Sequence, residues 1–320
     1  MKDTQQTLPN NSPAPLTAQQ AWLSRLAMAF VATAWGMAYV SVKYLLTHGW
    51  SQTQVAYIRI VLPGLILAPV AALAIRSHWG KPELKLLPRL AMLGFWGFGV
   101  SHFTVVWGQQ DTTAAVAGLL SVASPLTALT LAALFKIDRF SWNKAIGALL
   151  STCGVAIVVL LGRGPAELSF RHLSGPLLII FGFALVGVYN NAIRPLQRSF
   201  SPLEVSALTA VSPALLALLP ASAAFGATEW THLDPGSLAA ILWLGLIAGG
   251  LAIFSVGYAV NKIGPATAAS FLYLNPVISI LGGFLLLGEQ ITLWLLIGAV
   301  LILGGLSLTN QRAKNPTTTP

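Results

Sequence analysis

"LGFWGFGVSHFTVVW" (Leu93–Trp107) and "LGLIAGGLAIFSVGY" (Leu244–Tyr258) lie 151 residues apart and align without a gap. A leucine, two glycines and a phenylalanine coincide within these stretches. Further coincidences at the same offset extend in both directions: Gly36/Gly187, Pro69/Pro220, Pro125/Pro276, Asp138/Glu289, Gly147/Gly298 and Gly154/Gly305. Shared alanines or leucines mean little between apolar segments. Proline, glycine and acidic positions that coincide in one register indicate that the chain contains two copies of one unit.

The composition assigns these copies to a membrane. Of the 320 residues, 55% are hydrophobic and only 8% are charged, whereas soluble domains carry about 25% charged residues. The apolar residues form ten runs, each near the roughly 20 residues that an α-helix needs to cross the hydrocarbon core. We predict membrane helices at Leu23–Leu46, Thr53–Ile75, Leu86–Gly108, Thr112–Leu134, Phe140–Leu161, Ser174–Arg194, Leu203–Ala224, Ser237–Lys262, Pro265–Leu287 and Ile291–Thr309. The sequence therefore predicts an all-α polytopic membrane protein with ten transmembrane helices.

Five helices in each copy make the repeat inverted, because an odd number of crossings returns the chain to the opposite side. Inverted repeats are typical of secondary transporters, whose two halves meet around a site near the bilayer midplane. The predicted organisation is a disordered cytoplasmic tail (1–22), a first five-helix repeat (23–161), an outer connecting loop (162–173), a second repeat (174–309) and a cytoplasmic tail (310–320).

The net charge of +9 follows the membrane topology. With ten helices, most of the 18 lysine and arginine residues fall on the side of the two termini. This distribution fits the positive-inside rule. We therefore expect cytoplasmic termini, a lipid bilayer as the surroundings, and no nucleic-acid partner.

Several residues resemble those of EamA-type domains, in the ten-helix branch of the drug/metabolite transporter superfamily. In the first copy these are Trp35-Gly36 followed by Lys43, then Arg59, Pro125, Asp138-Arg139, Gly147 and Gly154. The second copy contributes Pro276, Glu289, Gly298 and Gly305. The resemblance covers nearly the whole chain except its tails. It implies a protein of the bacterial inner membrane that exports amino acids or related small metabolites by alternating access.

Lys43 illustrates how the repeat separates structural from functional residues. At the common offset Lys43 falls on Arg194, and both cations lie in the last turn of the first helix of their copy. Free carbonyl groups and the negative end of a helix dipole stabilise a cation there. A feature kept in both copies favours a structural role, although a substrate contact stays open because Trp35, Tyr39 and Lys43 share one helix face.

Residues that break the symmetry are the better substrate ligands. Arg59 lies about six residues, roughly 9 Å, inside its helix, where it needs a carboxylate, carbonyl groups or water. At the offset of 151 residues, Trp96 and His102 align with isoleucines of the second copy. His102 could relay protons. The predicted substrate-binding set is Trp35, Tyr39, Lys43, Arg59, Trp96, His102, Asn190, Tyr258, Tyr273 and Asn275.

Two prolines are expected to free backbone carbonyl groups within their helices. Pro125 and Pro276 lie mid-helix, and each removes one backbone donor. Carbonyl groups near Ser121 and Leu272 are therefore expected to be acceptors for a substrate ammonium. Asp138 and Glu289 fall in turns on opposite faces and are interpreted as structural, with Ser141 and Thr292 as caps of the following helices.

The main prediction is a transporter of zwitterionic metabolites, aromatic or other amino acids first, in a monomer or homodimer. Proton coupling and facilitated diffusion both stay open. The alternatives are an intramembrane enzyme acting on a lipid or isoprenoid, and a drug-efflux or nucleoside-type permease. No catalytic residue, metal site or cofactor is predicted, because paired carboxylates are absent and Cys153 is the single cysteine.

Overall fold

The computed structural model describes residues 17–135, 141–162, 170–226 and 233–309. All regular structure in these ranges is helical. Nine helical segments there are long and apolar enough to cross a membrane, and Leu293–Thr309 is a tenth, shorter apolar helix. The prediction of an all-α polytopic membrane protein is confirmed.

The elements follow the chain in an order that repeats. The first half contains α1 (Ala18–Thr47), α2 (Gln52–Ser77), η1 (Pro82–Leu86), α3 (Leu87–Gly94), η2 (Phe95–Val100), α4 (Ser101–Gln110), α5 (Ala114–Leu120), α6 (Ala123–Leu134) and α7 (Trp142–Leu161). The second half contains α8 (Phe170–Ala192), η4 (Leu196–Arg198), α9 (Pro202–Gly226), α10 (Pro235–Leu242), η6 (Trp243–Leu251), α11 (Ala252–Ile263), α12 (Pro265–Phe271), α13 (Leu274–Leu287) and α14 (Leu293–Thr309).

Contacts between α1 and α13 recur between α8 and α6 at the offset of 151 residues. A Cβ atom on Gly36 would lie 2.9 Å from the Asn275 carbonyl oxygen, and one on Gly187 would lie 2.5 Å from that of Ser124. Both glycines therefore permit close helix approach, and their contacts are equivalent in the two copies. This equivalence confirms the inverted repeat.

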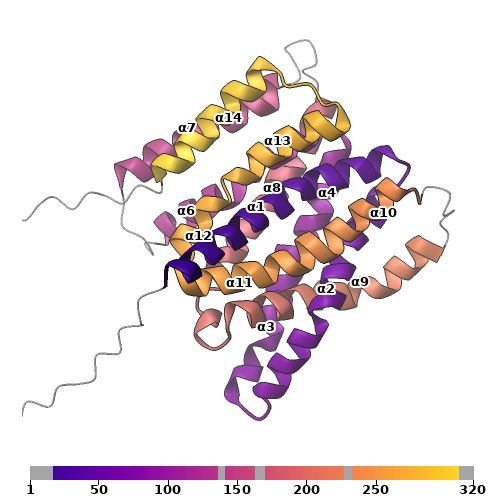
Figure 1. Ribbon diagram of the computed structural model, residues 1–320, viewed down its shortest axis with the longest axis vertical. Helices are drawn as coiled ribbons and strands as arrows, with labels where there is room; N and C mark the ends of the chain where they lie inside the picture. Colours follow the sequence, from indigo (N-terminus) through magenta and orange to yellow (C-terminus); the bar gives the residue numbers. More distant parts are fainter. Residues whose placement is uncertain (1–16, 136–140, 163–169, 227–232, 310–320) are drawn as a thin grey trace, which may run out of the picture.

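The last helices of the two halves, α7 and α14, pack antiparallel (Figure 1) through glycines at equivalent positions. Gly147 faces the carbonyl of Gly305, and Gly154 faces that of Gly298. Exchanging the two halves turns the first contact into the second. At the centre, Ser151 Oγ donates to the Ile302 carbonyl at 3.2 Å, and these two positions are themselves 151 residues apart.

The helices end at two opposite faces of the molecule. The described ends of the chain, the start of α1 and the end of α14, lie on the same side (Figure 1), here called the terminal face. The opposite side, with the α1–α2, α4–α5 and α13–α14 connections, is called the far face. The assignment of the terminal face to the cytoplasm stays a prediction from the basic residues.

Two helices, α1 and α8, begin earlier in the chain than predicted. The Thr17 side chain accepts from the Gln20 backbone and the Gln20 side chain accepts from the Thr17 backbone, a capping box that starts α1 at Ala18, inside the predicted tail. Helix α8 starts at Phe170, inside the predicted loop. Residues 1–16 and 163–169 lie outside the described residues, and so do Asp138 and Arg139.

Two membrane spans are interrupted at positions related by the repeat. The α5–α6 break falls at Ser121–Val122 and the α12–α13 break at Leu272–Tyr273. The expectation of free carbonyl groups there was wrong: Ser124 N donates to the Ser121 oxygen and Asn275 N donates to the Leu272 oxygen, both at 3.1 Å. Tightened three-residue turns at the breaks use these oxygens.

The third span of each half contains a π-helical stretch that the sequence did not predict. These stretches are Phe95–Val100 and Trp243–Leu251. Wider turns of this kind are frequent at functional sites. They overlap the two aligned glycine-rich sequences, so the π-helical geometry belongs to both copies.

Candidate functional site

Arg59 is a partly buried cation around which other predicted site residues lie. Its helix, α2, places it below the far face, and its Nη1 atom is buried without a hydrogen-bond partner among those residues. Part of the side chain nevertheless remains accessible. A guanidinium is always charged and carries five N–H donors. An unsatisfied donor at this depth indicates a ligand site.

Two other predicted residues come together around Arg59. Tyr39 of α1 and His102 of α4 are both close enough to interact electrostatically with its guanidinium, and the Tyr39 hydroxyl lies beside Ser121 at the α5–α6 break. Helices α1, α2 and α4 and the interruption of the fourth span therefore converge on this cation. Among the described groups near Arg59, none is a carboxylate.

His102 is fixed by its own helix. Its Nδ1 atom lies 2.6 Å from the Phe98 carbonyl oxygen, and its ring stacks on the Phe98 ring at 5.8 Å. A carbonyl oxygen can only accept, so Nδ1 carries a proton and Nε2 is the atom that can exchange one. The proposed role of His102 in proton relay stays a prediction.

Asn275 provides a neutral polar group on the facing half. It is buried at the start of α13, where α13 packs against α1. Its Oδ1 atom lacks a hydrogen-bond partner in the described parts of the chain. Asn275 is therefore, with Arg59, one of the two predicted site residues that have an unsatisfied buried side-chain atom among the described residues.

Lys43 binds the carbonyl end of α4. Its Nζ donates to the carbonyl oxygens of Gln109 and Gln110, both at 3.1 Å, where α4 ends. These bonds support the structural interpretation of Lys43. The helix end that they stabilise belongs to α4, however, and not to α1, which carries Lys43. Gln109, which the sequence reasoning missed, adds a bond from its Nε2 to the Tyr39 carbonyl at 3.0 Å.

Trp35 forms half of a reciprocal tryptophan pair. Its Nε1 donates to the Ala248 carbonyl at 3.1 Å, and Trp243 Nε1 donates to the Ala34 carbonyl at 3.0 Å. Both bonds join α1 to the π-helical stretch of the eighth span. Trp243 was not predicted, and its place beside the aligned glycine-rich sequence was the available signal.

No contact among the described residues brings the remaining predicted residues to Arg59. Trp96 and Tyr258 are 49% and 42% exposed. Asn190 is exposed and its Nδ2 donates weakly to Ser124 Oγ at 3.4 Å, while the Tyr273 hydroxyl donates to the Leu306 carbonyl at 3.4 Å. Their role in substrate binding stays a prediction.

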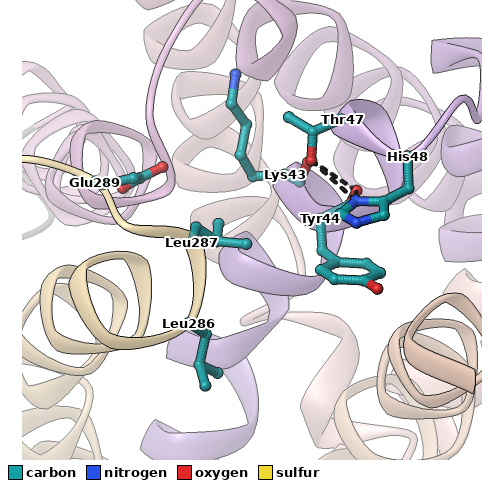
Figure 2. A pocket seen from close by; sticks show the side chains of 7 residues that line it. All are labelled: Lys43, Tyr44, Thr47, His48, Leu286, Leu287 and Glu289. Atoms are coloured by element: carbon teal, nitrogen blue, oxygen red, sulfur yellow. Dashed lines mark hydrogen bonds between the residues drawn. The ribbon is translucent and has the colours of Figure 1, made fainter.

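Glu289 closes the far face from the second half. Its carboxylate accepts from the backbone of Ala114 at 2.6 Å and Ala115 at 3.1 Å, at the start of α5. Figure 2 shows Glu289 and Lys43 at the edge of a pocket of about 330 Å³, without pointing at each other. Thr292 caps α14 as predicted, but Ser141 makes no capping bond to α7.

One far-face carboxylate outside the spans is held by hydrogen bonds. Asp234 accepts from the Ser237 backbone and from the Tyr44 hydroxyl, the latter at 3.1 Å. The bonds from Ser237, more than the one from Tyr44, hold the pKa of Asp234 below its ordinary value. The ionised carboxylate thus joins α10 to the end of α1.

Comparison with known proteins assigns the chain to a family. The profile of the EamA-like transporter family matches residues 22–160 and again residues 173–311. The chain belongs to the EamA-like transporter family. It is a multi-pass inner-membrane protein and a small-molecule transporter.

Two bacterial proteins and one solved structure illustrate the similarity. The "Probable terminal-alkyne amino-acid exporter" of Streptantibioticus cattleyicolor is 29% identical over 91% of this chain and 95% of its own length. The "Uncharacterized transporter YdfC" of Bacillus subtilis is 26% identical over 86% of this chain and 87% of its own. A crystal structure that is 20% identical matches with a TM-score of 0.61 over 89% of this chain and 95% of its own, and so shares the fold.

Proposed function

We propose that this EamA-like transporter exports amino acids or similar zwitterionic metabolites and that Arg59 binds their carboxylate. The buried, unpartnered Nη1 of Arg59 carries the proposal. A ligand carboxylate can accept two parallel hydrogen bonds from a guanidinium, which would complete the environment that the described side chains leave incomplete. The name of the Streptantibioticus relative, an amino-acid exporter, supports the same substrate class.

The proposed ligand orientation follows from the two unsatisfied groups. The carboxylate lies at Arg59 on α2, and the ammonium lies toward Asn275 Oδ1 on α13. Ser121 and the Tyr39 hydroxyl, which lie beside each other, supply further polar groups. A ligand between α2 and α13 contacts both repeats, as alternating access of an inverted-repeat transporter requires.

Counterflow in proteoliposomes tests this function. Vesicles loaded with a panel of aromatic and aliphatic amino acids are expected to accumulate the labelled amino acid, because exchange needs only binding and reorientation. Amines and carboxylic acids of matched side chain are expected to exchange more slowly, since each lacks one of the two charges. Equal exchange of the amine and the amino acid would contradict a carboxylate at Arg59.

The tryptophan pair gives a second prediction, on substrate choice. If the Trp35 ring also forms a wall of the cavity, it offers an ammonium-facing π surface of about 0.5–2 kcal/mol. Trp35→Phe keeps an aromatic ring and is expected to preserve the ranking of substrates, whereas Trp35→Ala is expected to change apparent affinities about tenfold. Competition uptake with the amino-acid panel measures both.

Trp243→Phe is the matched control for the lost indole bond. It removes the reciprocal hydrogen bond to Ala34 and keeps Trp35 in place. If Trp35→Ala and Trp243→Phe change uptake alike, the effect comes from the contact between α1 and the eighth span, and the aromatic wall is excluded.

A further inference from the structure

The two faces are packed differently although the repeat relates them. Near the far face, α5 packs against α13, and every residue of α5 is buried. Their counterparts near the terminal face are α12 and α6, which have no comparable packing in the described ranges. In α12, Thr267, Ala269 and Ser270 are exposed. The contact between α5 and α13 at the far face is therefore closed, and its counterpart between α12 and α6 at the terminal face is open.

Two charged side chains hold the far face closed. Glu289 accepts from the first N–H groups of α5, and Lys43 donates to the last carbonyl groups of α4. Each charge has the sign that stabilises its helix end. Hydrogen bonds of this charged kind are stronger than neutral ones. Lys43 joins α1 to the end of α4, and Glu289 joins the α13–α14 connection to the start of α5. We call these two contacts the far-face seal.

The repeat identifies the terminal-face equivalent of Lys43. At the offset of 151 residues, Lys43 corresponds to Arg194, and the carbonyls of Gln109 and Gln110 correspond to those of Val260 and Asn261 near the end of α11. Arg194 is exposed, and its side chain makes no hydrogen bond to the described residues. The two equivalent cations are thus in opposite states: Lys43 is bound to a helix end and Arg194 is not.

We propose that Arg194 binds the carbonyl groups at the end of α11 when the far face opens, and so closes the terminal face in the alternate state. Lys43 and Glu289 then stabilise the state described here, and Arg194 stabilises its opposite. Because a two-fold exchange of the halves converts one arrangement into the other, each cation is bound in one state and solvated in the other. This inference rests on transport by the chain, not on the identity of its substrate.

Cysteine labelling at two equivalent positions tests the exchange. Val116 in α5 is buried and its counterpart Thr267 in α12 is exposed. In a Cys153→Ser background, Val116→Cys and Thr267→Cys are labelled separately with a water-soluble maleimide, in nanodiscs that leave both faces accessible. The present state predicts fast labelling at Thr267→Cys and slow labelling at Val116→Cys.

Removing the charge of Glu289 or of Arg194 is expected to shift the two labelling rates in opposite directions. Glu289→Gln is expected to raise labelling at Val116→Cys by about tenfold, the effect of about 1.4 kcal/mol, and to lower labelling at Thr267→Cys. Arg194→Gln is expected to do the reverse. Arg198→Gln, an exposed cation on the same face, is the control without effect.

The same measurements can overturn the inference. If Arg194→Gln behaves like Arg198→Gln, Arg194 has no part in closure. If Glu289→Gln raises labelling at both sites together, the variant has loosened the fold and the seal is not part of an exchange. Arg194→Lys, which keeps a cation for the same carbonyl groups, is expected to restore the wild-type rates and would argue against the proposal if it did not. Loss of amino-acid exchange with intact labelling shifts would count against the proposed substrate alone.

Discussion

Replacing Arg59 by glutamine is expected to weaken the apparent affinity for amino acids by roughly 10- to 100-fold without destabilising the transporter. The loss corresponds to about 1.5–3 kcal/mol for hydrogen bonds to charged groups. The fold does not depend on the guanidinium, since its Nη1 has no partner in the described structure and a charge within the membrane is costly. Counterflow and thermal unfolding in detergent measure the two effects separately.

Lys43→Gln is the matched control for this variant. It also neutralises a cation in a membrane helix, but it removes two bonds to carbonyl oxygens at the end of α4. We expect a lower melting temperature and lower abundance, with residual transport by the protein that remains folded. Equal losses of folded protein in both variants would show that both cations are structural.

Gly305→Ala is expected to reduce the yield of folded transporter severely. A Cβ atom there would lie 2.4 Å from both the Gly147 carbonyl oxygen and Ser151 Oγ, and 2.7 Å from the Ser151 nitrogen. Backbone atoms cannot move aside cheaply, so α7 and α14 must separate. Overpacking of this kind costs about 1–3 kcal/mol or more. Detergent-solubilised yield and melting temperature measure the effect.

The adjacent glycine is a control on the same helix. A Cβ atom on Gly304 would meet nothing within 4 Å, and alanine favours a helix over glycine by up to about 1 kcal/mol. Gly304→Ala is therefore expected to leave the melting temperature unchanged or to raise it. Gly154→Ala, at the position equivalent to Gly305, is expected to destabilise as Gly305→Ala does. A uniform response of all three variants would contradict the described helix contact.

Much of the fold could be predicted from two patterns. Long apolar runs indicate the membrane spans, and coincident prolines and glycines indicate the repeat. The coincidence of Gly147 with Gly298 and of Gly154 with Gly305 indicated the repeat, and the structure places all four glycines in the contact between α7 and α14. The interrupted fourth and ninth spans could not be derived, because one continuous apolar run contains both helices and the break. Helix α1 extends into the predicted tail because its capping box at Thr17 and Gln20 lies in a polar sequence.

The candidate site was predictable only in part. Arg59 was found because a charge deep in an apolar helix is conspicuous, and its nearness to Tyr39 and His102 follows from three helices that converge. Gln109 and Trp243 were missed because polar and aromatic residues at span ends are common, and their bonds to backbone carbonyls depend on tertiary contact. Glu289 was interpreted as structural, but its partners at Ala114 and Ala115 could not be predicted because they lie 175 and 174 residues away.

The π-helical stretch Phe95–Val100 gives the third span a spare residue. Deleting one residue there would let the backbone continue as an ordinary α-helix, so the span should survive a change that breaks most helices. Everything beyond the deletion would keep its orientation, because the wide turn already absorbs the extra residue. His102 would stay near Arg59, and Gln109 would keep its bond to the Tyr39 carbonyl. The same deletion within α4 would turn the residues beyond it by about 100°, so the π-helical stretch is the part of this span that tolerates a change of length.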